Sequence, residues 1–207
     1  MEYERPRLAF FMGSRGGHRA FYESVDGYLK RLKSKGSVYF LEHIPHSHDS
    51  SALGRRFAKN LTKNHAREGT VLEGKKLFYN CHDVTVHELS RGETNIYVPL
   101  KSNGNIVFSR KYVNTEPADM RQEFNYSIRS LLDCGYGEDM VLIILSGNGD
   151  DGSFALGMAK ERGAKVIIQD PETASNPKIP ENAIETGHYD FILKPGEISK
   201  KVLELFE

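Results

Sequence analysis

Three side chains suited to nucleophilic acyl chemistry each follow an apolar run of the chain. Ser14 follows the first run, His43 the second, and Asp151 comes in the Gly-rich acidic loop after the third. The runs cover residues 8–12, 38–41 and 140–145. A serine hydroxyl becomes a strong nucleophile when an imidazole takes its proton, and a carboxylate can orient that imidazole and stabilise its charged form. The pattern therefore predicts a Ser–His–Asp hydrolase.

Glycines surround the predicted nucleophile in the run Gly13-Ser14-Arg15-Gly16-Gly17. Glycine lets the backbone turn sharply and lets a substrate carbonyl come close. The backbone N–H groups at the start of the helix that follows are suited to hold an oxyanion. The same kind of turn also suits a phosphate or a peptide, so a non-catalytic binding module is the alternative function.

Two groups of histidines raise the alternative of a metal hydrolase. One group contains His43, His46, His48 and Asp49, and the other contains His82, Asp83 and His87. Neither group has a standard ligand spacing such as HExxH. We therefore expect no metal and no other cofactor.

Asp151 alone also has a simpler interpretation, because it could cap the helix that starts near Ser153.

The first third of the chain has the pattern of alternating strands and helices. Phe21, Val25, Tyr28, Leu29 and Leu32 lie on one face of a predicted helix that Gly36 ends. Leu53, Phe57 and Leu61 predict another helix after the second apolar run. A βαβα order of this kind favours a parallel sheet.

The middle of the chain changes character. Short strands are predicted at residues 76–80, 84–89, 95–100 and 105–109. The turn signals Arg91-Gly92 and Asn103-Gly104 separate them. We expect an antiparallel ribbon inserted into the main domain.

The last third returns to alternation. Met120, Phe124, Ile128 and Leu131 predict a helix before the strand at 140–145, and Phe154, Ala155, Met158 and Ala159 predict one after it. A strand at 166–169, a short helix at 182–186, a strand at 191–193 and a last helix with Ile198, Val202, Leu205 and Phe206 complete the pattern. The fold class is α/β, a doubly wound and mostly parallel sheet flanked by helices, in one domain over residues 1–207. Ligands of such folds bind at the C-terminal ends of the strands, where Ser14, His43 and Asp151 are all predicted to lie.

The charge composition gives no reason to expect nucleic acid or a membrane surface as a binding partner. Lys and Arg total 28, Asp and Glu total 28, and the formal net charge is zero. Bulk attraction to nucleic acid or to a membrane surface is therefore not expected. The charged first residues and the short apolar run that follows do not form a signal peptide, and two distant cysteines suit a reducing compartment, so the expected location is the cytoplasm.

The residues at these loops resemble one known family, the catalytic domain of chemotaxis protein-glutamate methylesterases (CheB-like proteins). Leu145-Ser146-Gly147-Asn148-Gly149-Asp150-Asp151-Gly152 resembles the family's Thr/Ser-Gly-x-Gly-x-Asp-Gly loop. Ser14-Arg15-Gly16-Gly17 resembles its Ser-Thr-Gly-Gly loop, and Glu42-His43-Ile44-Pro45 resembles its Gln-His-Met-Pro loop. Residues 179–187 resemble its Met-Pro-Arg-x-Ala-Ile-x-x-Gly segment.

The resemblance implies hydrolysis of glutamate methyl esters on the helices of chemoreceptor-like proteins and, as a second reaction of some members, deamidation of glutamine. It implies that Ser14 is the nucleophile, His43 the base and Asp151, rather than its neighbour Asp150, the acid. It also implies that the backbone amide of Asn148 binds the oxyanion, in a predicted oxyanion and substrate-binding group with Gly149, Arg15 and Gly16.

The chain departs from the family pattern at Arg15, where the family usually has Thr. A guanidinium there could attract acidic helical substrates, and a simply solvated side chain is the alternative. The receiver domain that usually precedes this catalytic domain is expected to be absent, and regulation by its phosphorylation with it.

Overall fold

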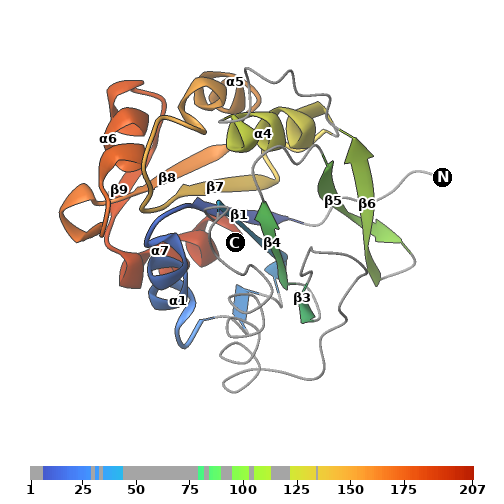
Figure 1. The fold of residues 1–207 in the computed structure, drawn as a ribbon. Helices are drawn as coiled ribbons and strands as arrows, with labels where there is room; N and C mark the ends of the chain where they lie inside the picture. Colours follow the sequence, from blue (N-terminus) through green and yellow to red (C-terminus); the bar gives the residue numbers. More distant parts are fainter. Residues whose placement is uncertain are drawn as a thin grey trace.

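A seven-stranded sheet forms the centre of the protein, in the order β3-β4-β2-β1-β7-β8-β9 (Figure 1). The computed structural model describes residues 7–28, 31–32, 35–43, 79–81, 84–89, 95–102, 105–112, 122–133 and 135–207. The order reverses between β1 and β7, because the chain runs from β1 to β2 on one side and from β7 to β9 on the other. Such a reversal is where open α/β sheets bind ligands.

Six of these strands are parallel. They are β1 (Leu8–Gly13), β2 (Ser37–His43), β4 (Val84–Leu89), β7 (Met140–Ile144), β8 (Lys165–Gln169) and β9 (Phe191–Leu193). Strand β3 (Tyr79–Cys81) is antiparallel to β4 and forms one edge of the sheet. The fold class predicted from the sequence, a doubly wound and mostly parallel α/β domain, is confirmed.

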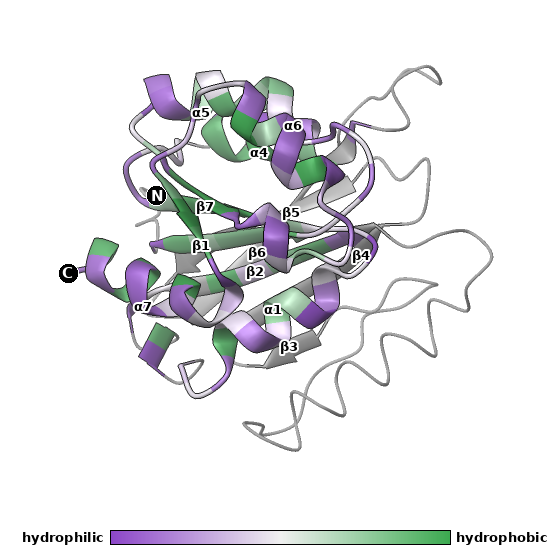
Figure 2. Ribbon diagram, turned by 90° about the vertical axis from the view of Figure 1, so that its left-hand side faces the viewer, coloured by the Kyte–Doolittle hydropathy of each residue, from purple (hydrophilic) through white to green (hydrophobic). Residues whose placement is uncertain are grey.

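Helices cover both faces of the sheet (Figure 2). On one face lie α1 (Gly17–Val25) and α7 (Pro195–Leu205), which contact each other. On the other face lie α4 (Glu123–Asp133), α5 (Leu156–Glu161) and α6 (Lys178–Glu185). Short 3-10 helices occur at η2 (Ser153–Ala155) and η3 (Pro171–Thr173).

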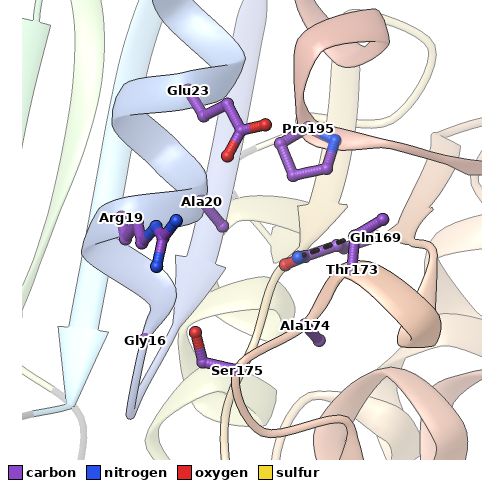
Figure 3. A pocket seen from close by; sticks show the side chains of 9 residues that line it. All are labelled: Gly16, Arg19, Ala20, Glu23, Gln169, Thr173, Ala174, Ser175 and Pro195. Carbon is purple, nitrogen blue, oxygen red and sulfur yellow. Dashed lines mark hydrogen bonds between the residues drawn. The ribbon is translucent and has the colours of Figure 1, made fainter.

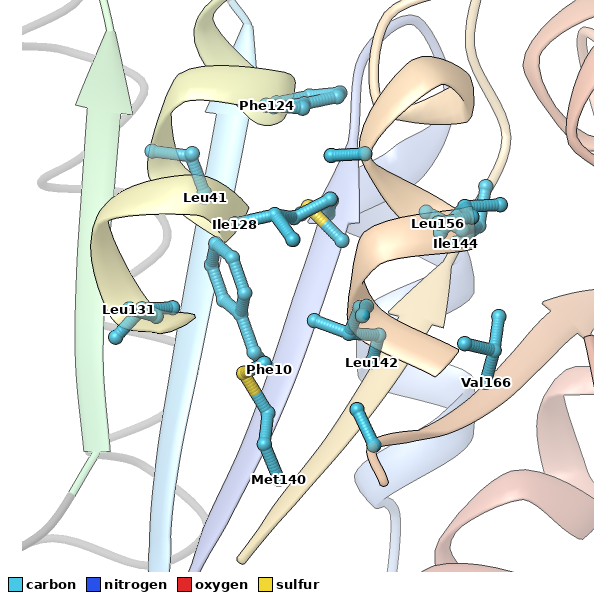
Figure 4. Packing of buried hydrophobic residues seen from close by; sticks show 14 of the residues in the cluster. Phe10, Leu41, Phe124, Ile128, Leu131, Met140, Leu142, Ile144, Leu156 and Val166 are labelled. Carbon is cyan, nitrogen blue, oxygen red and sulfur yellow. The ribbon is translucent and has the colours of Figure 1, made fainter. Parts of the chain in front are cut away.

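Two hydrophobic cores result from the alternation of side chains along each strand. In β1, Phe10 and Met12 face the α4–α6 core, whereas Ala9 and Phe11 face the α1–α7 core. Figure 4 shows the first core, in which side chains of α4 and α5 pack on those of β1, β2, β7 and β8. Strand β1 is fully buried and contributes to both cores, so the loop that follows it starts from the centre of the sheet.

The middle of the chain contains two different arrangements. Strands β5 (Asn95–Ser102) and β6 (Asn105–Tyr112) form a separate two-stranded antiparallel sheet. The strand at Val84–Leu89, predicted as part of an antiparallel ribbon, pairs antiparallel with β3 on one side and in parallel with β2 on the other, so it belongs to the main sheet. The alternating pattern of that strand indicates a strand but does not select its partner, which is distant in sequence.

The first helix is shorter than predicted. Helix α1 ends at Val25 and a turn follows through Tyr28, whereas the pattern predicted one helix ending at Gly36. Gly27 in that turn has φ +71°, the left-handed conformation that commonly ends a helix. The other predicted helix, at Leu53 to Leu61, lies outside the described residues. Among the described residues, no helix is long and apolar enough to cross a membrane.

Candidate active site

The C-terminal ends of β1, β2 and β7 bring the three predicted loops together. Gly13 at the end of β1 pairs with Glu42 in β2. Ser14 and His43 are the residues that directly follow this pair, so their backbones lie side by side. On the other side of β1, Met12 pairs with Ile144 at the end of β7. The backbone therefore places the Ser14 loop between the strand that ends at His43 and the loop that contains Asp151. The side chain of His43 lies outside the described part of the structure.

The Ser14 loop is tightly folded. Its first peptide is fixed to the end of β7, because Ser14 N donates to Ser146 O at 2.9 Å. Gly17 N then donates back to Ser14 O at 2.7 Å, which closes the turn into α1. Gly16 has φ +86° and is the N-cap of α1. The glycine at 16 is needed for this left-handed conformation.

Gly147 lies close to the predicted nucleophile. A Cβ at position 147 would lie 2.9 Å from Ser14 Cβ and 2.5 Å from Ile179 Cδ1. Real Cβ atoms do not reach such distances, so either Ser14 or Ile179 would have to move. The glycine thus permits the acid loop and the Ser14 loop to touch.

Asp151 is buried, with 4% of its surface exposed. Its carboxylate accepts N–H groups from Phe124 at 2.8 Å and Asn125 at 3.1 Å, both in the first turn of α4. Asn125 in turn accepts the N–H of Ala155 at 2.9 Å. The carboxylate therefore caps α4, and the positive end of that helix stabilises its negative charge.

This corrects the expectation about caps near Ser153. The residue before η2 is Gly152 at φ +94°, and no side chain caps that helix. Asp150 is exposed, and among the described contacts its backbone carbonyl accepts Ser153 N at 3.2 Å. Phe154, predicted on the inner face of a helix, is 74% exposed. The 3-10 turn that precedes α5 directs it outward.

The predicted oxyanion and substrate-binding residues lie in two segments, Arg15 and Gly16 in the Ser14 loop and Asn148 and Gly149 in the loop after β7. Arg15 and Asn148 are exposed, and Gly16 and Gly149 are partly buried. Gly149 has φ +112°, and its carbonyl accepts Asn182 Nδ2 at 2.7 Å. This bond joins the Gly-x-Gly turn to α6 and limits its movement.

The chain matches the family model described as CheB methylesterase over residues 10–202. The chain belongs to the CheB methylesterase family. A protein-glutamate methylesterase/protein-glutamine glutaminase of Carboxydothermus hydrogenoformans is 26% identical over 193 residues, which are 93% of this chain and 51% of that protein. One from Hydrogenovibrio crunogenus is 25% identical over 188 residues, covering 89% of this chain and 46% of that protein. The chain thus spans about half the length of these relatives.

The crystal structure of the Thermotoga maritima CheB methylesterase catalytic domain has the same fold. It superposes with a TM-score of 0.68 at 20% identity, covering 98% of this chain and all of that one. The CheB family match includes all three loops at the sheet edge, since it runs from β1 to α7.

Two residues beside the candidate site, Ser146 and Glu42, were not predicted from the sequence to have a role there. Ser146 is fully buried, and its hydroxyl donates to Arg15 O at 2.9 Å and accepts Asn176 N at 2.9 Å. Glu42 is 8% exposed and accepts both His18 N and His18 Nδ1 at 3.1 Å. A carboxylate within an otherwise apolar strand was the available signal for Glu42, because such groups are buried only with partners.

The Glu42 contact changes the titration of His18. The hydrogen bond that the His18 imidazole donates to Glu42 raises the pKa of His18 above its ordinary value, although partial burial opposes this. The charged form of the imidazole is therefore favoured at the first turn of α1, directly beside the Ser14 loop.

A small open pocket of about 150 Å³ adjoins the Ser14 loop at Gly16 (Figure 3). Arg19 and Glu23 of α1 face the loop after β8 across it, and Pro195 of α7 closes one side. The remaining lining residues are Ala20, Gln169, Thr173, Ala174 and Ser175. Both charge signs line the pocket, so it has no clear preference for an anion or a cation.

Within the described residues, no three His, Cys, Asp or Glu side chains gather as a metal site would require. Both histidine-containing groups considered in the sequence include residues outside the described ones, so they remain untested.

Proposed function

We propose that the chain is a serine hydrolase that removes methyl esters from glutamate side chains of chemoreceptor-like proteins. Glutamine deamidation is the second reaction that the names of the relatives suggest. In this proposal Ser14 is the nucleophile, His43 the general base and Asp151 the acid that orients His43. The observation that carries it is the family match over residues 10–202 together with the meeting of these three loops at one sheet edge.

The reaction follows acyl-transfer chemistry. Ser14 Oγ attacks the ester carbonyl carbon while its proton passes to His43. The oxyanion of the tetrahedral intermediate accepts a hydrogen bond from the backbone N–H of Asn148. The intermediate expels methanol with the proton from His43, and water then hydrolyses the acyl-enzyme to leave a glutamate carboxylate.

Two structural facts support these roles. The Asp151 carboxylate is held by two backbone N–H groups, so its position is fixed before substrate arrives. The Ser14 backbone is fixed to β7 by a hydrogen bond, and Gly147 leaves room for it. Preorganised groups of this kind reduce the reorganisation that a reaction requires.

A fluorophosphonate probe tests the reaction class. We expect it to label Ser14 with or without a chelator, and we expect Ser14→Ala to lower kcat for a small ester by about 10⁴-fold or more. Absence of both labelling and ester hydrolysis in the folded chain would instead favour the non-catalytic binding module.

A second measurement tests the substrate. Methanol should be released from a methyl-esterified chemoreceptor signalling fragment, and Ser14→Ala should stop the release. Hydrolysis of small esters without methanol release from the fragment would leave the enzyme class intact and reject the substrate.

A further inference from the structure

The carboxylate of Glu42 joins the strand that ends at His43 to the helix that follows Ser14. Its Oε1 accepts the backbone N–H of His18 at 3.1 Å and lies 3.1 Å from His18 Nδ1. Glu42 is the residue directly before His43, and His18 is in the first turn of α1. One carboxylate oxygen therefore contacts both the backbone and the side chain of the helix start.

Close packing leaves this contact little freedom. A Cβ at Gly17 would lie 3.2 Å from Ser146 O and 3.9 Å from Glu42 Oε1. The glycine thus lets the first turn of α1 lie directly against β2 and β7. The side chain of Glu42 is 11% exposed, so its carboxylate is solvated mainly by the N–H groups of His18 rather than by water.

The Ser14 loop is held on the opposite side of β1 as well, by Ser146. In the loop after β7, Ser146 holds the Ser14 loop by its backbone carbonyl, which accepts Ser14 N, and by its hydroxyl, which donates to Arg15 O. From β2, Glu42 fixes the end of the same loop at His18. The loop is thereby held between the two strands that flank β1.

We propose that Glu42, acting through His18, is a positioning residue that fixes the Ser14 loop to the strand that ends at His43. The proposal rests on the roles of Ser14 and His43 given above. The nucleophile and its base belong to different strands, so their separation depends on contacts that join the two loops. A misplacement of about 1 Å in such a pair can cost on the order of 100-fold in rate.

The acceptor oxygen of Glu42 is suited to the start of α1. The first N–H groups of a helix have no partner within the helix, and a negative group near them is stabilising. His18 N is one of these groups. Neutral glutamine can still accept this N–H, whereas leucine cannot, so Glu42→Gln and Glu42→Leu separate the hydrogen bond from the shape of the side chain.

Asp190 provides a matched control at the other edge of the sheet. Its carboxylate also accepts one backbone N–H, from Val166 at 2.8 Å, and it pairs with the cationic side chains of Lys160 at 2.6 Å and Lys165 at 3.8 Å. Val166 is near the start of β8, away from the strand ends that hold Ser14. Asp190→Asn should therefore lower stability without reaching the site.

The experiment compares wild type, Glu42→Leu, Glu42→Gln and Asp190→Asn in the full chain. For each, kcat and KM for a small ester, the melting temperature and the amide exchange rate at residue 18 are measured. We expect Glu42→Leu to lower kcat about 10- to 100-fold with KM changed less than about threefold, and to speed exchange at residue 18 at least about tenfold. Glu42→Gln should keep kcat within about threefold of wild type. Asp190→Asn should lower the melting temperature but leave kcat and the exchange rate at residue 18 unchanged.

The outcomes are decisive in either direction. If folded Glu42→Leu keeps wild-type kcat, or if Asp190→Asn loses as much, the positioning role is rejected. If wild type neither hydrolyses esters nor reacts with the probe, the proposed function fails, while exchange at residue 18 still decides whether Glu42 fixes the loop. If Glu42→Leu does not fold, His18→Ala takes its place, with an expected loss in kcat of about threefold to tenfold and unchanged KM.

Discussion

Asp151 and Asp150 are adjacent carboxylates after the same strand, and the structure predicts that replacing Asp151 costs far more stability and activity than replacing Asp150. Asp151 is buried and holds two backbone N–H groups at the start of α4. Asp150 is exposed, and among the described contacts it contributes only a backbone carbonyl. Replacing each by asparagine removes the same charge from two very different surroundings.

The cost in stability follows from the hydrogen bonds. The carboxylate of Asp151 uses one oxygen for Phe124 N and the other for Asn125 N, whereas an asparagine has a single acceptor oxygen. Its amide NH₂ would then face a backbone N–H, donor against donor. Loss of one hydrogen bond to a charged group costs about 1.5–3 kcal/mol, and loss of a helix cap costs about 1 kcal/mol. We expect Asp151→Asn to lower the free energy of unfolding by about 2–3 kcal/mol, and Asp150→Asn to change it by less than about 0.5 kcal/mol.

The effect on the reaction should be larger still. Asp151→Asn removes the charge that stabilises an imidazolium, and in a well-studied serine protease such a change lowers kcat by up to about 10⁴-fold. Asp150→Asn should cost less than about tenfold. The assays are urea unfolding and steady-state hydrolysis of a small ester, at a temperature where circular dichroism shows both variants folded. A larger kcat loss in Asp150→Asn would reject the assignment of the acid, and unchanged stability in Asp151→Asn would contradict its role as a cap.

Three further outcomes are expected. Gly147→Ala should lower both the melting temperature and kcat, because the added methyl group would displace Ser14 or Ile179, whereas an increase in either quantity would contradict the packing. Ser153→Ala should raise the free energy of unfolding by up to about 1 kcal/mol in urea titrations, since the Ser153 hydroxyl is buried with no hydrogen-bond partner among the described residues. The contribution of His18 should be full below its unfolded pKa of about 6.5 and should be lost as pH rises through its raised folded pKa. The stability difference between wild type and His18→Gln should accordingly shrink from pH 5.5 to pH 8.5, and a difference that grew with pH would reject the contact with Glu42.

The strands of the parallel sheet were largely predictable because their signals are local. Continuous apolar runs identified β1 and β7, and the residues that follow them mark the sheet edge where ligands bind. The end of α1 was also available from the sequence, in Asp26-Gly27, but the spaced apolar residues up to Leu32 favoured a longer helix. The outward position of Phe154 was not available, because a single 3-10 turn rotates the pattern by an amount that periodicity does not reveal.

Contacts between residues that are distant in sequence could not be predicted. The parallel pairing of β4 with β2 depends on register in the folded sheet. The cap that Asp151 provides for α4 joins residues 26 and 27 positions apart. His18 and Glu42 were each visible in the sequence, but their contact exists only because β1 places the start of α1 beside β2.

The cap on α4 also turns two backbone amides into spectroscopic reporters. The N–H groups of Phe124 and Asn125 donate to the carboxylate of Asp151 and lie in a buried, hydrophobically packed helix. Protonation of that carboxylate weakens both hydrogen bonds, so the amide proton resonances of residues 124 and 125 shift together with its charge. The ionisation of the proposed acid can therefore be followed by two-dimensional NMR in the resting protein, without substrate, inhibitor or turnover.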